Sequence, residues 1–147
     1  MKKLYIHYGN EFNRDKFHPI KNYRSWTKPS GGFWASNINS DFGWKDWVKD
    51  SEMDDTFSLE KSFIFSLKEG SKVLFIESKE DLKNIPQRKD NSGIMFLPDQ
   101  FYIDFEKLYK DGWDAVEVKI KNLYWDLYGW DCDSIVIMNP DIIIKEN

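Results

Sequence analysis

The chain has 147 residues, a formal net charge of −4 and a pI of about 5.2, with both signs of charge spread along it. This balance lacks the basic footprint of a nucleic-acid-binding protein, and no apolar run reaches the ~18 residues needed to span a bilayer. The single cysteine excludes an internal disulfide and is typical of a reducing cytoplasm. The length favours one domain, and the aromatic content of 17%, with seven Trp, indicates either an aromatic core or surfaces that stack on something flat.

The N-terminal third begins with a β-rich run at residues 3–9, which we interpret as a first strand because it lacks the apolar stretch of a signal peptide. Residues 10–31 are polar, aromatic and irregular, and predict a long ordered loop. A short strand is expected at 32–36. The segment 39–53 places Phe42, Trp44, Trp47 and Val48 on one rough helical face, which predicts a helix.

The middle of the chain shows alternation of Phe and Leu with Ser over 62–68, the pattern of a strand. The run 71–78 predicts its neighbour, and the short connection favours a hairpin between the two. Ser78 and Asp81 have capping-box spacing, so a short helix is expected to begin there and to end before Pro86. Residues 86–93 predict an exposed loop.

The C-terminal third predicts one helix and then strands. The segment 103–112 carries its apolar residues on one side and stops at Gly112, a residue favoured at a helix C-terminus. Strands are expected at 114–120 and 133–138, and 141–145 closes the chain. The sum is a single α+β domain over residues 1–147, richer in strand than in helix, with short helices between strands.

The sequence lacks the motifs of several common metal-binding, catalytic and phosphate-binding sites. Two His and one Cys at these spacings do not make a zinc site, so no metal is expected, and we assign no role to His18. No Ser lies in a nucleophile elbow and no Gly-rich loop forms a phosphate cradle. His7, on the first strand, taken alone reads as a partly buried imidazole bonded to a backbone carbonyl. Asp133, at the start of a buried strand, taken alone reads as a strand-end cap facing water.

Three short segments, taken together and in their order along the chain, favour a functional role for His7 and Asp133. They are "LYIHYG" with His7, "GGFWAS" with Trp34, and "DSIVIMNPDII" with Asp133. Together they resemble the ADP-ribosyltransferase superfamily, in its diphtheria-toxin-like and poly(ADP-ribose)-polymerase-like branch, which carries a "YHG"-like motif, "GxGIYFA(S)" and "EYVVFDPSQI". The segment "DGWDAVEV" is similar to the "GYDGV" strand that often precedes the last motif. Here Tyr8 separates His7 from Gly9, Trp34 stands for the family's Tyr, and Asp133 stands for its Glu.

The resemblance implies a fold and a chemistry. The fold would be a split mixed or antiparallel β-sheet core with short helices, and the substrate would be NAD, with no metal. His7 would bond the adenosine-side ribose, the backbone at Tyr8 and Gly9 would clamp the nicotinamide amide, and Trp34 would stack on the nicotinamide ring. Gly31 and Gly32 would let the backbone approach, Ser36 would make a minor contact, and Asp133 would stabilise positive charge on the reacting ribose.

Three functions remain open on the sequence alone. The first is a cytoplasmic, toxin-like or phage-type mono-ADP-ribosyltransferase that modifies a macromolecular acceptor, which we expect to be a protein. Loops such as 10–30 and 86–100 would choose that acceptor. The second is a non-catalytic nucleotide-binding module on the same fold, because Asp for Glu and Trp for Tyr are changes that can retain binding and lose turnover. The third is a protein-interaction domain whose interface is formed by exposed Trp side chains, namely Trp26, Trp44, Trp47, Trp125 and Trp130.

Overall fold

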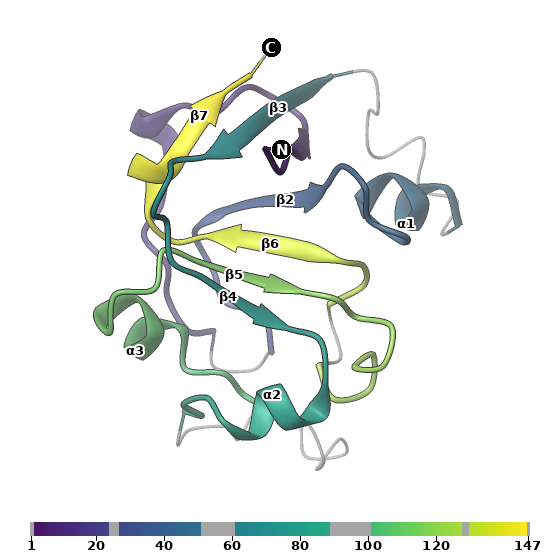
Figure 1. Cartoon of the computed structure of the whole chain (residues 1–147), viewed down its shortest axis with the longest axis vertical. Coiled ribbons are helices and arrows are strands. Elements are labelled where there is room, and N and C mark those ends of the chain that lie inside the picture. The colour runs from purple at the N-terminus through teal and green to yellow at the C-terminus, as the bar shows by residue number, and fades with distance from the viewer. Residues whose placement is uncertain (1, 24–26, 51–60, 89–100, 128–129, 147) are drawn as a thin grey trace.

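The computed structural model describes residues 2–23, 27–50, 61–88, 101–127 and 130–146. Figure 1 shows short helices arranged around strands, with the two ends of the described chain on the same side of the molecule. The elements in chain order are β1 (Tyr5–Tyr8), the 3-10 turn η1 (Arg14–Lys16), β2 (Phe33–Asn37), α1 (Trp44–Asp50), β3 (Ser62–Leu67), β4 (Val73–Ile76), α2 (Lys79–Lys83), α3 (Phe105–Lys110), β5 (Ala115–Val118), β6 (Ser134–Ile137), the 3-10 turn η2 (Pro140–Ile142) and β7 (Ile143–Lys145).

The strands form one seven-stranded mixed sheet in the order β4-β5-β6-β2-β1-β3-β7. The pair β4 and β5 is parallel, and the other five pairs are antiparallel. The predicted α+β class is therefore confirmed. The strand order is continuous from edge to edge, whereas the resemblance implied a split sheet.

Two hydrophobic clusters lie on the two faces of this sheet. The first joins Val116 and Val136 to Leu82 of α2, to Phe105 of α3 and to Trp130. The second runs across the other face from β5 and β6 through Ala35 of β2 to side chains of β1 and β3. The sheet is strongly twisted in Figure 1.

Local signals in the sequence placed most elements correctly. Ser78 accepts a hydrogen bond from the backbone of Asp81, and the Asp81 side chain accepts from the backbone of Ser78, so the predicted capping box begins α2. Gly112 has a φ of +102° just after α3, which confirms its predicted role in ending the helix. A helix in the predicted segment 39–53 is present as α1.

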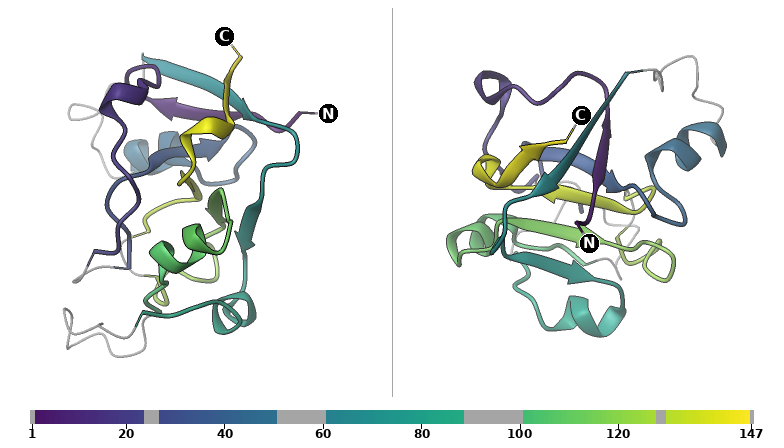
Figure 2. Two further views of the ribbon diagram at one scale, coloured as in Figure 1. Left: turned by 90° about the vertical axis from the view of Figure 1, so that its left-hand side faces the viewer. Right: turned by 45° about the horizontal axis from the view of Figure 1, so that its top comes forward.

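The predicted hairpin between β3 and β4 is wrong. β3 pairs with β1 and β7, and β4 pairs with β5 on the opposite edge of the sheet. Figure 2 shows the chain leaving β3 at one end of the molecule and running across to β4 at the other. Apolar strands separated by a short connection resemble a hairpin in sequence, but the pairing is decided by burial against distant strands.

Gly31 and Gly32 form the turn that leads into β2, with φ values of +75° and +72°. A Cβ at Gly31 would lie 2.1 Å from the backbone oxygen of Pro19, and one at Gly32 would lie 2.6 Å from a methyl carbon of Val136. The N–H of Gly32 donates to the oxygen of His18 at 2.8 Å. The space beside both glycines is therefore filled by the chain itself, and the approach to NAD that the resemblance implies stays a prediction.

We expect Gly31→Ala to lower the free energy of unfolding by roughly 2–4 kcal/mol, because left-handed strain and a backbone clash add together. Gly70→Ala is the matched control, since Gly70 has a φ of +87° but nothing within 4 Å of the place that a Cβ would take. That variant should lose only the strain of about 1–2 kcal/mol. Urea denaturation measures both, and equal losses would contradict the packing argument.

Candidate functional site

The three segments that carry the resemblance become neighbouring strands. β2, with Trp34, is paired on one side with β1, which carries His7, and on the other side with β6, which follows Asp133 directly. The register places Trp34 opposite Val136 and Ile6 opposite Ser36. Segments at the two ends of the sequence thus lie side by side at the centre of the sheet.

His7 is half-buried and is held by a backbone contact. Its Nδ1 lies 2.6 Å from the backbone oxygen of Trp34, so the Nδ1–H donates to that carbonyl. The ring also packs on Phe33 at a centroid distance of 4.3 Å. Burial lowers the pKa of His7, with the bond to the Trp34 carbonyl opposing this effect, so the imidazole is neutral at physiological pH. A neutral ring bonded through Nδ1 leaves Nε2 as an acceptor.

Trp34 presents its ring to the other face of the sheet. Its Nε1–H donates to the oxygen of Gly31 at 3.1 Å, and its ring lies 5.0 Å from that of the buried Trp130 in the first hydrophobic cluster. Successive strand residues point to opposite faces, and Phe33, which contacts His7, packs against the second cluster. The rings of His7 and Trp34 therefore lie on opposite faces of the ladder.

The Trp34 ring has one further neighbour that the sequence did not indicate. The ammonium of Lys28 lies 5.2 Å from the Trp34 ring centroid and 5.6 Å from that of Trp44 on α1. These are cation–π distances. Lys28 stands in an irregular loop, and no periodicity or motif marked it beforehand.

The remaining predicted contact residues also have structural partners. The Ser36 hydroxyl donates to the backbone oxygen of Asp133 at 2.8 Å and accepts from the N–H of Trp44 at 3.1 Å. Gly9 follows β1 with a φ of +136°, and its N–H donates to the backbone oxygen of Lys61. Burial, with a smaller contribution from Asp46 on α1, raises the pKa of Tyr8.

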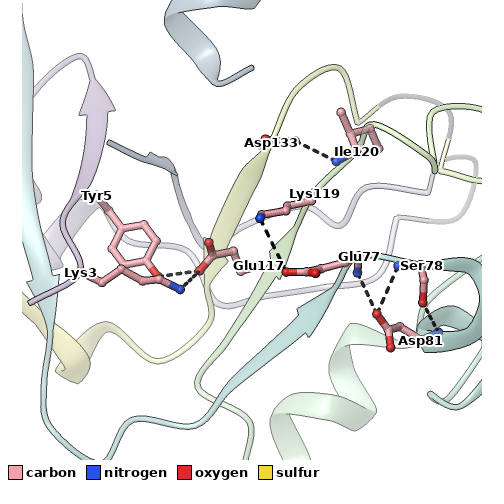
Figure 3. Close-up of polar contacts among 9 residues, drawn as sticks. All are labelled: Lys3, Tyr5, Glu77, Ser78, Asp81, Glu117, Lys119, Ile120 and Asp133. Atoms are coloured by element: carbon pink, nitrogen blue, oxygen red, sulfur yellow. Dashed lines mark hydrogen bonds and ion pairs between the residues drawn. The ribbon is translucent and has the colours of Figure 1, made fainter. Parts of the chain in front are cut away.

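Asp133 lies in a different environment. Its residue is only 9% exposed, and one carboxylate oxygen accepts from the N–H of Ile120 at 2.9 Å, as Figure 3 shows. Burial raises the pKa of Asp133, and the charge of Asp41 adds to this shift. Backbone contacts to Ile120 and Phe42 and the charge of Lys119 oppose it. The carboxylate is thus neither a water-facing cap nor an exposed group at a cleft mouth.

The NAD site that the resemblance implies would bring His7, Trp34 and Asp133 around one cavity, but the rings of His7 and Trp34 lie on opposite faces of the ladder. Asp133 lines two adjoining hollows, and neither includes His7 or Trp34 among its lining residues. The larger hollow instead brings Asp133 together with Glu117 of β5, which sequence reasoning missed. The sequence signal that could have indicated Glu117 is its charged side chain within the otherwise apolar β5. The functional roles assigned to the three residues remain predictions.

The Trp side chains named for an interaction surface divide into different environments. Trp130 is fully buried, so its assignment to an exposed interface is wrong. Trp125 is 70% exposed, whereas Trp44 and Trp47 are partly buried. Trp26 lies outside the described residues. Of the described Trp side chains in this set, only Trp125 is strongly exposed.

None of the described helices has the length and apolar character to cross a membrane. No family model, no curated protein and no solved structure matches this chain.

Proposed function

We propose that the chain is an NAD-dependent mono-ADP-ribosyltransferase, which transfers ADP-ribose from NAD to a macromolecular acceptor and releases nicotinamide. The observation that carries the proposal is the order β6-β2-β1, because it makes neighbours of the three segments that resemble the superfamily. On this proposal the sheet is a variant of the ADP-ribosyltransferase fold.

The departure of nicotinamide from NAD needs little catalytic assistance. The nicotinamide of NAD is already a cation, so it departs without a general acid, and the ribose passes through an oxocarbenium-like state as in glycoside hydrolysis. The protein must therefore hold the two ends of NAD and place negative charge near the ribose.

The binding roles proposed for β1 and β2 are those that the resemblance implies, and NAD would have to contact both faces of the ladder, because the rings of His7 and Trp34 lie on opposite faces. His7 Nε2 would accept from an adenosine-side ribose hydroxyl, since Nδ1 is bonded to Trp34. The Trp34 ring would stack on nicotinamide, with the backbone of Tyr8 and Gly9 holding its amide. Gly31 and Gly32 shape the turn beneath the Trp34 ring, and Ser36 links β2 to α1. Asp133 would supply the charge, as the resemblance implies.

The acceptor is proposed to be a protein encountered in the cytoplasm. Its choice would rest on loops around the sheet, of which 10–30 is largely described and 86–100 lies mostly outside the described residues. Loops of this kind commonly carry specificity on a rigid scaffold.

A second function, NAD binding without turnover, is favoured by the position of Asp133. Its carboxylate accepts from the N–H of Ile120 and lines a hollow with Glu117 that the Trp34 ring does not line. A carboxylate held apart from the proposed nicotinamide platform stabilises a cation on the ribose poorly, because the interaction between charges weakens with distance. The same fold would then hold the nucleotide and leave it intact.

Two measurements test the proposal. NAD should raise the melting temperature, since a ligand at 100 times its Kd stabilises the native state by about 2.7 kcal/mol. Incubation with NAD labelled in the adenine moiety should release nicotinamide and label a protein in a cell lysate. Binding without release or labelling would leave the second function, and calorimetry showing no binding at millimolar NAD would remove both.

A further inference from the structure

A single ammonium group reaches two tryptophan rings that belong to different elements. The Nζ of Lys28 lies 5.2 Å from the ring centroid of Trp34 on β2 and 5.6 Å from that of Trp44 on α1. Both distances fall within the ~6 Å over which the negative face of an aromatic ring attracts a cation. Proteins recognise organic cations with aromatic rings arranged in this way around the positive charge.

Both rings are held by contacts that do not involve the ammonium. The Nε1–H of Trp34 donates to the oxygen of Gly31 at 3.1 Å, and the Trp34 ring packs at 5.0 Å against the fully buried Trp130. The ring of Trp44 meets that of Trp47 edge to face at a centroid distance of 5.5 Å. The two rings are therefore positioned independently of the cation that they share.

Lys28 is anchored by its neighbours in the chain and not by its charge. Thr27 is 2% exposed, and its oxygen accepts from the Nε1–H of Trp130 at 3.4 Å, while Pro29 is buried. Among the described residues, the Lys28 ammonium forms no ion pair with a carboxylate. Because lysine carries its charge on a flexible four-carbon stem, the ammonium can leave the rings while the backbone stays in place.

We infer that Trp34 and Trp44 form a binding site for a permanently charged organic cation, which the chain fills with its own Lys28 and which the ligand enters by displacing the Lys28 ammonium. Two cations cannot share these rings at low cost, because like charges a few Å apart repel each other. Occupation by Lys28 therefore lowers the affinity for an added cation by about the strength of the lysine's own contact with the rings.

This inference deepens the proposed function, and its consequence for NAD rests on that proposal. The nicotinamide ring of NAD is a pyridinium cation, so stacking it on Trp34 requires Lys28 to move away. When the bond between the ribose C1′ and the ring nitrogen breaks, its electron pair stays with the nitrogen, and the released nicotinamide is neutral. A neutral ring competes less well with the returning ammonium. Lys28 thus favours release of the product.

Titration calorimetry on the full chain with 1-methylnicotinamide tests the inference. This probe carries the cationic ring without ribose or phosphate, and nicotinamide is the matched neutral probe. Lys28→Met keeps an unbranched side chain and removes the charge, so it should bind 1-methylnicotinamide about threefold to 30-fold more tightly than the wild-type protein does. The same variant should bind the cation at least about threefold more tightly than nicotinamide.

Three further variants locate the effect at the rings. Lys28→Arg keeps a cation that stacks on aromatic faces, so it should show no gain in affinity. Lys21→Met removes the charge of an exposed lysine in the same loop and should leave the affinity unchanged. Trp44→Leu, added to Lys28→Met, removes one ring and should weaken 1-methylnicotinamide about threefold or more. Circular dichroism and melting curves verify that each variant is folded.

Three results would each overturn the inference. They are an affinity for 1-methylnicotinamide that Lys28→Met fails to raise, an equal rise in Lys21→Met, and a Lys28→Met protein that binds the cation no more tightly than nicotinamide. Failure of the proposed function gives a different result, in which 1-methylnicotinamide binds as expected but NAD is neither bound nor cleaved. Conversely, a protein that fails these titrations and still turns NAD over would leave the transferase standing.

Discussion

Replacing Asp133 by Asn is expected to slow nicotinamide release about 100-fold or more, while NAD affinity changes little. Loss of one well-placed electrostatic partner of the transition state typically has this size. The ground state of NAD does not yet carry the developing ribose charge, so the effect should appear in kcat rather than in binding. Release of nicotinamide under saturating NAD and a parallel titration of NAD measure the two quantities.

Two companion variants make this result specific. Asp133→Glu restores the residue usual in the superfamily. Lower activity would indicate that the site is adapted to the shorter side chain, and higher activity would indicate a decayed enzyme. Asp111→Asn removes an exposed carboxylate that pairs with Lys107, and it should leave the rate unchanged. An Asp133→Asn protein that turns NAD over at the wild-type rate would contradict the catalytic role proposed for Asp133.

The elements that sequence predicted correctly are those with signals in adjacent residues. The Ser78 and Asp81 pair marked the start of α2, and Gly112 marked the end of α3, because both depend on backbone groups a few residues away. β3 was predicted by alternation, which burial on one face of a strand imposes. These signals are local, and tertiary packing did not override them.

The errors arise where distant residues decide the outcome. Nothing between β3 and β4 indicates that β3 will pair with β1 and β4 with β5, because strand partners are chosen by the burial of whole faces. Trp130 was assigned to an exposed interface, yet its ring packs against Trp34 and Phe105 from other segments. Exposure of a Trp in a loop cannot be predicted without knowing what packs over it.

The resemblance named the residues of the candidate site and the strands expected to carry them, but not which strands pair. His7, Trp34 and Asp133 lie on or beside three adjacent strands. Their side chains diverge because side-chain direction alternates with each residue, so a shift of one position reverses the face. Asp133 also precedes the first paired residue of β6, where the ladder no longer fixes its direction. A motif match fixes residue type and strand more firmly than it fixes orientation.

Trp130→Ala is expected to be the most destabilising change in the core. Trp130 has no exposed area, its ring lies 6.1 Å from Phe105 in a stacked arrangement and 5.0 Å from Trp34, and its Nε1–H donates to the oxygen of Thr27 at 3.4 Å. Truncating a buried Trp costs roughly 3–5 kcal/mol because packing is lost and a cavity remains. For a domain of this size each kcal/mol lowers the melting temperature by about 2–4 °C.

The matched control is Trp125→Ala, which removes the same side chain from a position that is 70% exposed. Surface substitutions usually change stability by no more than about 0.5 kcal/mol, so the two melting curves should separate by roughly 5–20 °C. Similar small losses of stability for both variants would contradict the burial of Trp130.

Because Trp130 supports the ring of Trp34 from below, a milder Trp130→Phe should also weaken NAD binding more than Trp125→Ala does. In protein that remains folded, only the loss of support beneath the Trp34 ring should change NAD affinity. The comparison therefore separates that loss from the general destabilisation caused by a core cavity.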